Sequence, residues 1–406
     1  MRSNTANSLA FFLVSFGALL AAVSCSDANS SHLSDQSAPA LIRFNMNDST
    51  VSEFIGEFDG GSWVLYNGKE AIALQPANDT LWRVPVFSGS WSLTADHTKS
   101  VYTGRWVDSL RHSGDGDYSV PLSISLNEKP EVNRGYDSTP RKGTWDVWFN
   151  EERLGLADAQ LDINHQDGRL SATMRTATGD YRYLTGTCIN HKLRLQTFDG
   201  AHLYLFTATY SNGSWQDGVF YSGNHYKTPW VGQRASPLHN ENPMEVLRVS
   251  DADLTAAFIN RSGQNDTVSL VSDSLIVVDI LGTWCPNCMD EVRLLESLKT
   301  PSARFISLAF ERDTTARLAY QRLDGFASEL QMDWDVYWGG KASKQVAAKA
   351  FPFLDRVISF PTTLFIRGNQ VVVHSGFNGP ATGSYYTSER QHFVDQLSGF
   401  TSLGNH

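Results

Sequence analysis

Two cysteines with two residues between them are the side chains in this sequence best suited to chemistry. Cys285 and Cys288 enclose Pro286 and Asn287, and the apolar run Leu275–Leu281 precedes them. A three-residue offset places both sulfurs on one face of a helix, where they can close a small disulfide loop. The same spacing also serves half of a zinc site, but the sequence has no second cysteine pair and no histidines at ligand spacing nearby. We therefore interpret Cys285–Cys288 as a redox-active disulfide, and we expect no metal and no cofactor.

The elements expected around the pair determine its reactivity. The apolar run predicts a strand buried on both faces, and the residues after it predict a helix, because apolar side chains recur at Met289, Val292, Leu295 and Leu298. Cys285 then lies at the helix N-terminus, where unpaired N–H groups and the helix dipole stabilise a thiolate. Such a position lowers a thiol pKa from about 8.5 into the range of roughly 3.5–7.5. Cys288, one turn later, is placed to resolve a mixed disulfide.

Two segments resemble those of a known family. The segment 278–288 (VDILGTWCPNC) resembles the active-site strand and loop of the thioredoxin superfamily, and it is most similar to the TlpA/ResA-type branch of membrane-tethered extracytoplasmic thiol–disulfide oxidoreductases. The segment 358–364 (ISFPTTL) resembles the part of that family that carries a cis-proline. The resemblance therefore implies a cis peptide bond before Pro361 and exposed backbone groups there that align an extended substrate. It covers residues 247–400, and no family is identified for residues 41–240.

The resemblance implies roles for two carboxylates. Asp279 occupies the position of the buried aspartate that takes the proton of the resolving thiol, and burial among apolar neighbours is expected to raise its pKa. Glu291 matches the position of an active-site glutamate in ResA-like proteins. The alternatives are a buried, hydrogen-bonded Asp279 without a catalytic role, and an exposed Glu291 that the helix dipole favours in the first turn.

Two aromatic residues complete the predicted substrate-binding set with Pro361. Trp284 precedes Cys285 and is expected to cover the disulfide, with a place in the core as the alternative. Phe360 stands where relatives more often carry small or β-branched residues. It would either narrow the substrate groove or add an apolar contact.

The remaining pattern predicts a multidomain chain. In residues 247–400, strands alternate with helices before a hairpin and a closing helix, which is typical of an α/β thioredoxin-like domain with a mixed sheet. The expected elements are helices 251–259, 314–330, 341–350 and 388–400 and strands 304–310, 334–338, 363–367 and 370–374. Residues 41–240 show short alternating runs between turn signals, which predict an antiparallel all-β sandwich or barrel. The polar stretch 127–142 is a candidate boundary between two β subdomains.

The beginning of the chain reads as a targeting segment. Leu9–Val23 is apolar but too short to span a bilayer, so residues 1–24 are interpreted as a signal peptide. Small residues then lead into Cys25, which resembles a bacterial lipoprotein box. We expect a lipidated Cys25 and a flexible tether over residues 25–40, with plain secretion or an uncleaved anchor as alternatives. The last cysteine, Cys188, is expected to be a buried apolar residue.

Together these features predict a membrane-tethered periplasmic thiol–disulfide oxidoreductase that works as a reductase. The expected partners are a protein disulfide substrate, a membrane thiol donor implied by the resemblance, and the membrane through the lipid. The net charge of −10 and the lack of a basic run argue against nucleic acid. The alternative is a lipoprotein whose β domain binds a partner or ligand, with the thioredoxin-like domain as a redox sensor or structural appendage.

Overall fold

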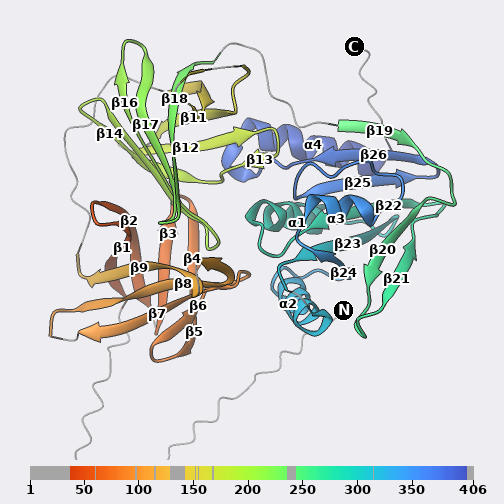
Figure 1. The fold of residues 1–406 in the computed structure, drawn as a ribbon, viewed down its shortest axis with the longest axis horizontal. Coiled ribbons are helices and arrows are strands. Elements are labelled where there is room, and N and C mark those ends of the chain that lie inside the picture. The colour runs from red at the N-terminus through yellow and green to blue at the C-terminus, as the bar shows by residue number, and fades with distance from the viewer. Residues whose placement is uncertain are drawn as a thin grey trace, which may run out of the picture. The chain divides into compact units, whose positions relative to one another are not determined.

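Three hydrogen-bonded sheets organise the part of the chain that the structure describes (Figure 1). The structure is a computed structural model, and it describes residues 37–59, 61–96, 98–113, 116–128, 142–150, 152–153, 155–166, 169–235, 244–313 and 315–399. The predicted signal peptide, Cys25 and most of the predicted tether lie outside the described residues, as does most of the stretch 127–142.

The first sheet is antiparallel and has the order β4-β3-β2-β1-β9-β8-β7-β6-β5, so two runs of consecutive strands meet where β1 pairs with β9. Alternate residues of its strands are buried, as expected for strands that face a core on one side only. Its strands are β1 (Ala38–Asn47), β2 (Thr50–Asp59), β3 (Ser62–Asn67), β4 (Glu70–Ala73), β5 (Gln75–Asn78), β6 (Leu81–Arg83), β7 (Gly89–Asp96), β8 (Val101–Ser113) and β9 (Gly116–Leu126).

The second sheet closes on itself. Its order is β11-β10-β18-β17-β16-β15-β14-β12-β13. A further pairing of β11 with β12 closes all of these strands except β13 into a ring. A turn at Asn212-Gly213 connects β16 to β17, and both residues have the positive φ, 50° and 81°, that a tight hairpin needs. The strands are β10 (Gly143–Trp148), β11 (Ala159–Gln166), β12 (Arg169–Thr176), β13 (Gly179–Asp180), β14 (Leu184–Ile189), β15 (Lys192–Phe198), β16 (Leu203–Ser211), β17 (Ser214–Ser222) and β18 (Tyr226–Arg234).

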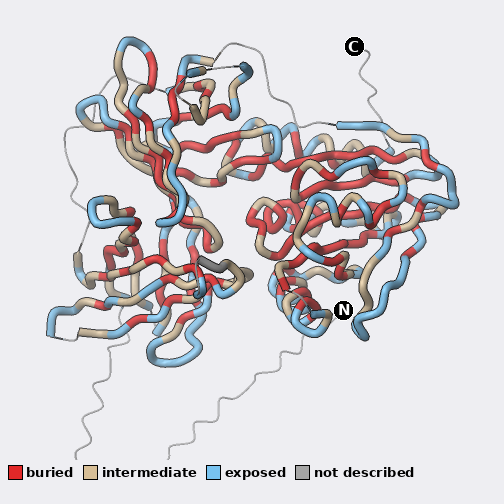
Figure 2. The backbone as a smooth tube through the Cα atoms, in the orientation of Figure 1, coloured by how far each residue is buried: buried red, intermediate tan, exposed pale blue. Residues whose placement is uncertain are grey.

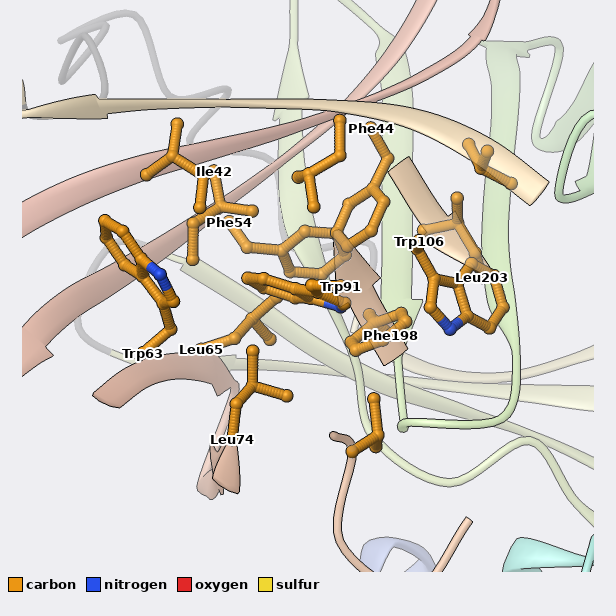
Figure 3. Packing of buried hydrophobic residues seen from close by; sticks show 14 of the residues in the cluster. Ile42, Phe44, Phe54, Trp63, Leu65, Leu74, Trp91, Trp106, Phe198 and Leu203 are labelled. Carbon is orange, nitrogen blue, oxygen red and sulfur yellow. The ribbon is translucent and has the colours of Figure 1, made fainter. Parts of the chain in front are cut away.

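An aromatic core joins these two sheets. Phe198 of β15 stacks on Phe44 of β1 with ring centroids 4.9 Å apart, and it meets the Trp106 ring of β8 edge-on at 5.1 Å (Figure 3). Leu203 and Leu205 of β16 belong to the same buried cluster. The predicted antiparallel β architecture is therefore confirmed, and residues of the second sheet complete the core of the first.

The third sheet is mixed. Its order is β19-β26-β25-β22-β23-β24-β20-β21; β22, β23 and β24 run parallel, and the other pairings are antiparallel. Its strands are β19 (Met244–Arg248), β20 (Thr255–Ile259), β21 (Asn265–Ser269), β22 (Leu275–Leu281), β23 (Ala303–Glu311), β24 (Asp335–Lys341), β25 (Thr362–Arg367) and β26 (Gln370–Ser375). The helices are α1 (Pro286–Leu298), α2 (Ala316–Glu329), α3 (Lys344–Lys349), the 3₁₀ turn η1 (Pro380–Thr382) and α4 (Ser384–Ser398).

Helices cover both faces of this sheet. Every residue of β22 is buried, as the apolar run predicted, and the central strands appear as continuous red tube in Figure 2. One face packs with α1 and α4 through residues such as Val277, Leu295 and Phe393. The other face packs with α3 and the segment after it through Val278, Ala347 and Phe351. The mixed α/β sheet predicted for this part of the chain is confirmed.

One predicted element is wrong. The helix expected over 251–259 is instead a turn followed by strand β20, which pairs with β21 and with β24. The residues of β20 include the β-branched Thr255 and Ile259 and the aromatic Phe258, which favour a strand when neighbouring strands are available for pairing. The predicted helix 341–350 is also shorter than expected, because Lys341 still belongs to β24.

Candidate active site

The cysteine pair lies at the start of α1. Cys285 is the N-cap residue and Cys288 lies in the first turn, and the two are joined as a disulfide with their Cα atoms 5.2 Å apart. The backbone N–H of Cys288 donates to the Cys285 sulfur at 3.2 Å. Cys285 is 6% exposed and Cys288 is 0% exposed. A backbone amide therefore points at the more accessible sulfur, which favours a thiolate there when the pair is reduced.

A buried carboxylate fixes the loop that leads into the pair. Both oxygens of Glu311, at the end of β23, accept hydrogen bonds from Thr283, one from its backbone N–H and one from its hydroxyl, each at 2.8 Å. Burial raises the pKa of Glu311 to about 7. The sequence interpretation did not single out Glu311, because its partner is 28 positions away and nothing local marks it.

Trp284, Phe360 and Pro361 meet beside the disulfide. The Phe360–Pro361 peptide bond is cis, as the resemblance implied. The carbonyl oxygen of Phe360 lies 3.5 Å from the Cys285 sulfur. The Trp284 and Phe360 rings contact edge-on at 5.5 Å, and the Trp284 indole N–H donates to the carbonyl of Phe310 at 2.9 Å. Trp284 and Phe360 are only partly buried, so the structure leaves an aromatic surface next to Cys285.

Asp279 and Glu291 form a buried pair. Asp279 is 1% exposed and accepts from the Ser307 hydroxyl at 3.3 Å, while Glu291 is 0% exposed and accepts from the Thr363 hydroxyl at 2.6 Å. The exposed alternative for Glu291 is therefore wrong. Burial raises the pKa of Asp279 to about 7. Burial and then the neighbouring Asp279 charge raise the pKa of Glu291 well above its ordinary value. The pair can hold and release a proton near neutral pH.

The β-rich part of the chain contributes contacts to the cysteine motif. The Asn287 side-chain amide, between the two cysteines, donates to the backbone carbonyl of Asp180 at 3.0 Å and to that of Phe377 at 3.3 Å. Gly179 has a φ of +128°, and a Cβ atom there would lie 2.9 Å from the Asn287 amide nitrogen. The segment around β13, between β12 and β14, therefore lies so close to the cysteine motif that a side chain at position 179 would collide with Asn287.

A buried arginine anchors the same segment. Arg182 is 2% exposed and forms paired hydrogen bonds with Asp290 of α1, at 2.8 and 3.1 Å. It also binds Glu70 of β4 through two hydrogen bonds of 2.8 and 3.1 Å. One guanidinium, from the segment between β13 and β14, thus links β4 of the first sheet to helix α1 beside the disulfide. The sequence interpretation missed this cluster, because its members lie more than a hundred positions apart.

Other predicted features lie away from this chemistry. Cys188 of β14 is buried, as expected. Across the described ranges, no cluster of three His, Cys, Asp or Glu side chains is arranged to hold a metal ion. No helix in the described part of the chain is both long and apolar enough to cross a membrane.

Comparisons with known proteins find similarity to solved structures. A secreted Mycobacterium tuberculosis disulfide oxidoreductase homologous to E. coli DsbE shares 15% identity over 37% of this chain and 99% of its own, with a TM-score of 0.27. The thioredoxin domain of a Bacteroides vulgatus thiol-disulfide oxidoreductase shares 13% identity over 36% of this chain and 98% of its own, with a TM-score of 0.26. A DsbF homologue from Corynebacterium diphtheriae shares 15% identity over 38% and 92%, with a TM-score of 0.25.

These similar structures are thioredoxin-like thiol–disulfide oxidoreductases, and each match covers little more than a third of this chain. No protein-family model and no curated protein matches the sequence. At such low identities and TM-scores, the likenesses do not carry an activity over to this chain, since one fold hosts many activities.

Proposed function

We propose that this protein reduces protein disulfides by thiol–disulfide exchange through Cys285 and Cys288. The observation that carries the proposal is the disulfide at the N-terminus of α1, with the cis Phe360–Pro361 carbonyl 3.5 Å from its outer sulfur. That arrangement combines a sulfur activated by a helix terminus with backbone groups able to align an extended substrate strand.

The first step uses the outer cysteine. In the reduced protein, the Cys285 thiolate attacks one sulfur of a substrate disulfide, so that a Cys285–substrate disulfide forms and the other substrate sulfur leaves as a thiolate. The aromatic surface of Trp284 and Phe360 and the backbone beside Pro361 hold the substrate segment during this attack. The leaving thiolate takes up a proton from solvent.

The second step uses the inner cysteine. Glu291 lies three residues after Cys288 on the same face of α1, and it interacts directly with Asp279. Asp279 accepts the Cys288 thiol proton, aided by Glu291, and the resulting thiolate attacks the Cys285 sulfur. The mixed disulfide breaks, the second substrate sulfur leaves as a thiolate that takes up a proton from solvent, and two electrons have passed from the cysteine pair to the substrate.

We assign the remaining parts of the chain accordingly. Residues 1–24 direct export, a lipid on Cys25 tethers the protein in the periplasm, and residues 247–400 act as a TlpA/ResA-like reductase domain that a membrane thiol donor resets. Residues 41–240 act as a specificity arm, because Asp180 and Arg182 contact the motif and its helix directly.

Insulin reduction tests this proposal. The reduced wild-type protein is expected to precipitate insulin chains in the presence of a thiol donor, whereas Cys285→Ser should lose this activity because no outer thiolate remains. Cys188→Ala is the matched control, since Cys188 is buried in β14 and should leave the rate unchanged. Equal rates for wild type and Cys285→Ser would remove the enzyme proposal and favour a binding lipoprotein.

The direction of the reaction has a separate test. A reduction potential for the Cys285–Cys288 pair near about −270 mV fits a reductant, and one near about −120 mV indicates an oxidant. Equilibration against glutathione buffers, followed by alkylation and mass spectrometry, gives this value.

A further inference from the structure

A polar row crosses the central sheet beneath the disulfide. Across β23, β22, β25 and β26, the residues in register are Ser307, Asp279, Thr363 and His374. All four are buried. In-register neighbours on adjacent strands share one face of the sheet. The next row on the same face is entirely apolar and consists of Phe305, Val277, Phe365 and Val372. The polar row is therefore a local exception in a hydrophobic layer.

Side chains of two helices extend this row. From α1, Glu291 accepts the Thr363 hydroxyl. From α4, Glu389 lies 3.6 Å from the His374 Nε2 atom, and the charge of Glu389 contributes to the raised pKa of Glu291. His392 of α4 stacks on His374 with ring centroids 5.1 Å apart. These are the titratable groups that face His374, and His392 alone among them is only partly buried.

Two ring nitrogens of the row, His374 Nδ1 and His392 Nε2, lack hydrogen-bond partners within the described residues, whereas the carboxyl groups of Asp279 and Glu291 share a hydrogen bond with each other. Buried polar atoms are nearly always satisfied, and ordered water is the usual partner where protein groups do not serve. An imidazole nitrogen can donate or accept a hydrogen bond, so the two rings can pass a proton through such waters. Burial and then His392 lower the pKa of His374 to about 3, so its ring is neutral, with one nitrogen that donates and one that accepts.

The proposed reaction requires a route by which protons leave the buried Asp279. Each catalytic cycle delivers one proton from Cys288 to Asp279, and Asp279 is sealed from solvent. We infer that Glu291, His374, Glu389 and His392 form a proton relay between Asp279 and the protein surface. His392 is the exit of this relay, and His374 and Glu389 are its middle. This inference rests on the proposed exchange chemistry, but it concerns proton transfer rather than substrate choice.

The relay is tested with dithiothreitol, which needs no protein substrate. A dithiothreitol thiolate attacks the Cys285 sulfur, the Cys288 thiolate that leaves takes a proton through the relay, and the second dithiothreitol thiol frees Cys285 as cyclic dithiothreitol forms. Single-turnover reduction is followed by tryptophan fluorescence at saturating dithiothreitol. His374→Gln and His392→Ala are expected to slow this step by about tenfold, less than the 10²–10⁴-fold typical of losing a general base, because water still supplies some protons.

Two further readouts separate a relay from a structural role. Imidazole in the buffer should restore most of the rate of His392→Ala, because it can replace the lost exit group at the surface, and it should not restore Asp279→Asn. The reduction potential and the rate of Cys285 alkylation should equal those of wild type, because a relay changes the rate of proton transfer and not the end states. His202→Gln, between β15 and β16, is the matched control and should behave as wild type.

Each result decides the inference. Wild-type rates in both relay variants would overturn it, and so would slow rates that imidazole does not restore or that accompany a changed potential. If His374→Gln does not fold, His392→Ala alone still tests the relay, because His392 is only partly buried and its replacement should not prevent folding. A wild-type protein that reacts with dithiothreitol but not with insulin would count against the proposed function alone.

Discussion

At the scale of single residues, the buried pair Asp279 and Glu291 makes the site sensitive to pH. Both carboxyl groups are buried, and the described residues place no cation against either of them. A buried carboxylate without a counter-charge binds a proton more tightly than an exposed one. The native protein therefore holds a proton here that the unfolded chain releases, and this difference makes stability depend on pH.

Asp279→Asn should remove the Asp279 part of this pH dependence. Because the pKa of Asp279 is raised to about 7, its contribution to stability is full below the unfolded pKa of about 3.9 and is lost as the pH rises to about 7. The asparagine variant should thus be more stable than wild type at pH 8, by about 1–3 kcal/mol, and similar at pH 4. Urea unfolding at both pH values measures this. The exposed Asp273→Asn is the control, and a wild-type curve that does not change with pH would refute the account.

The same substitution should slow the exchange reaction. The base must be unprotonated to accept the Cys288 proton, so the wild-type rate should rise with pH through about 7. Asp279→Asn should lower the rate at pH 7 by roughly 10²-fold and abolish that rise. Stopped-flow oxidation of the reduced protein over pH 5–9, divided at each pH by the Cys285 thiolate fraction, gives the profile, and a preserved rise in the variant would exclude Asp279 as the base.

At the scale of elements, local spacing predicted the features around α1. The strand Leu275–Leu281, the cysteine pair and the proline segment 358–364 lie in short, contiguous patterns, and the structure brings them together. The Thr283–Glu311 hydrogen bonds and the row from Ser307 to His374 depend on strand register, which a single sequence does not reveal. The helix predicted over 251–259 is wrong for the same reason, because pairing with β21 and β24 decides the conformation of this segment.

Phe198 tests how far the two β sheets depend on each other. It projects from β15 of the second sheet into the aromatic core of the first, against Phe44, Trp91 and Trp106. Phe198→Ala should destabilise the protein by about 3–5 kcal/mol, because it leaves a cavity between large rings. Hydrogen exchange should then show faster opening in strands of both sheets. Faster exchange confined to β14–β16 would contradict a shared core.

At the scale of the whole molecule, the Glu70–Arg182–Asp290 cluster ties the β-rich part to α1. Arg182→Met should destabilise the protein by about 3–5 kcal/mol, because the buried Asp290 and the partly buried Glu70 lose the cation they share, and the exposed Arg293, 3.4 Å from Asp290, compensates only in part. Replacing all three residues with apolar ones should cost less than the single change, since no charge then remains buried alone. Thermal unfolding of the two variants compares these costs, and a single variant as stable as wild type would show that the cluster does not anchor the segment around β13.

Substitution of Arg182 also distinguishes a role of the β-rich part in substrate binding from a role in the exchange reaction. If the β-rich part only positions substrates, Arg182→Met should lower the rate with insulin and leave the rate with dithiothreitol unchanged. Loss of both rates would mean that the cluster maintains the cysteine motif itself, through the Asn287–Asp180 hydrogen bond. Neither partner in this contact is marked by its own neighbours in the sequence, which is why only the folded chain reveals it.

The pH at which Cys285 loses its proton decides whether this residue can act as the nucleophile. The rate of iodoacetamide alkylation of the reduced protein, resolved by mass spectrometry at residue 285, follows the thiolate fraction. The helix terminus and the Cys288 N–H that faces the sulfur predict a midpoint well below about 8.5, in the range of roughly 3.5–7.5. A midpoint at or above about 8.5 would contradict the account, because the proposed nucleophile would then be protonated at neutral pH.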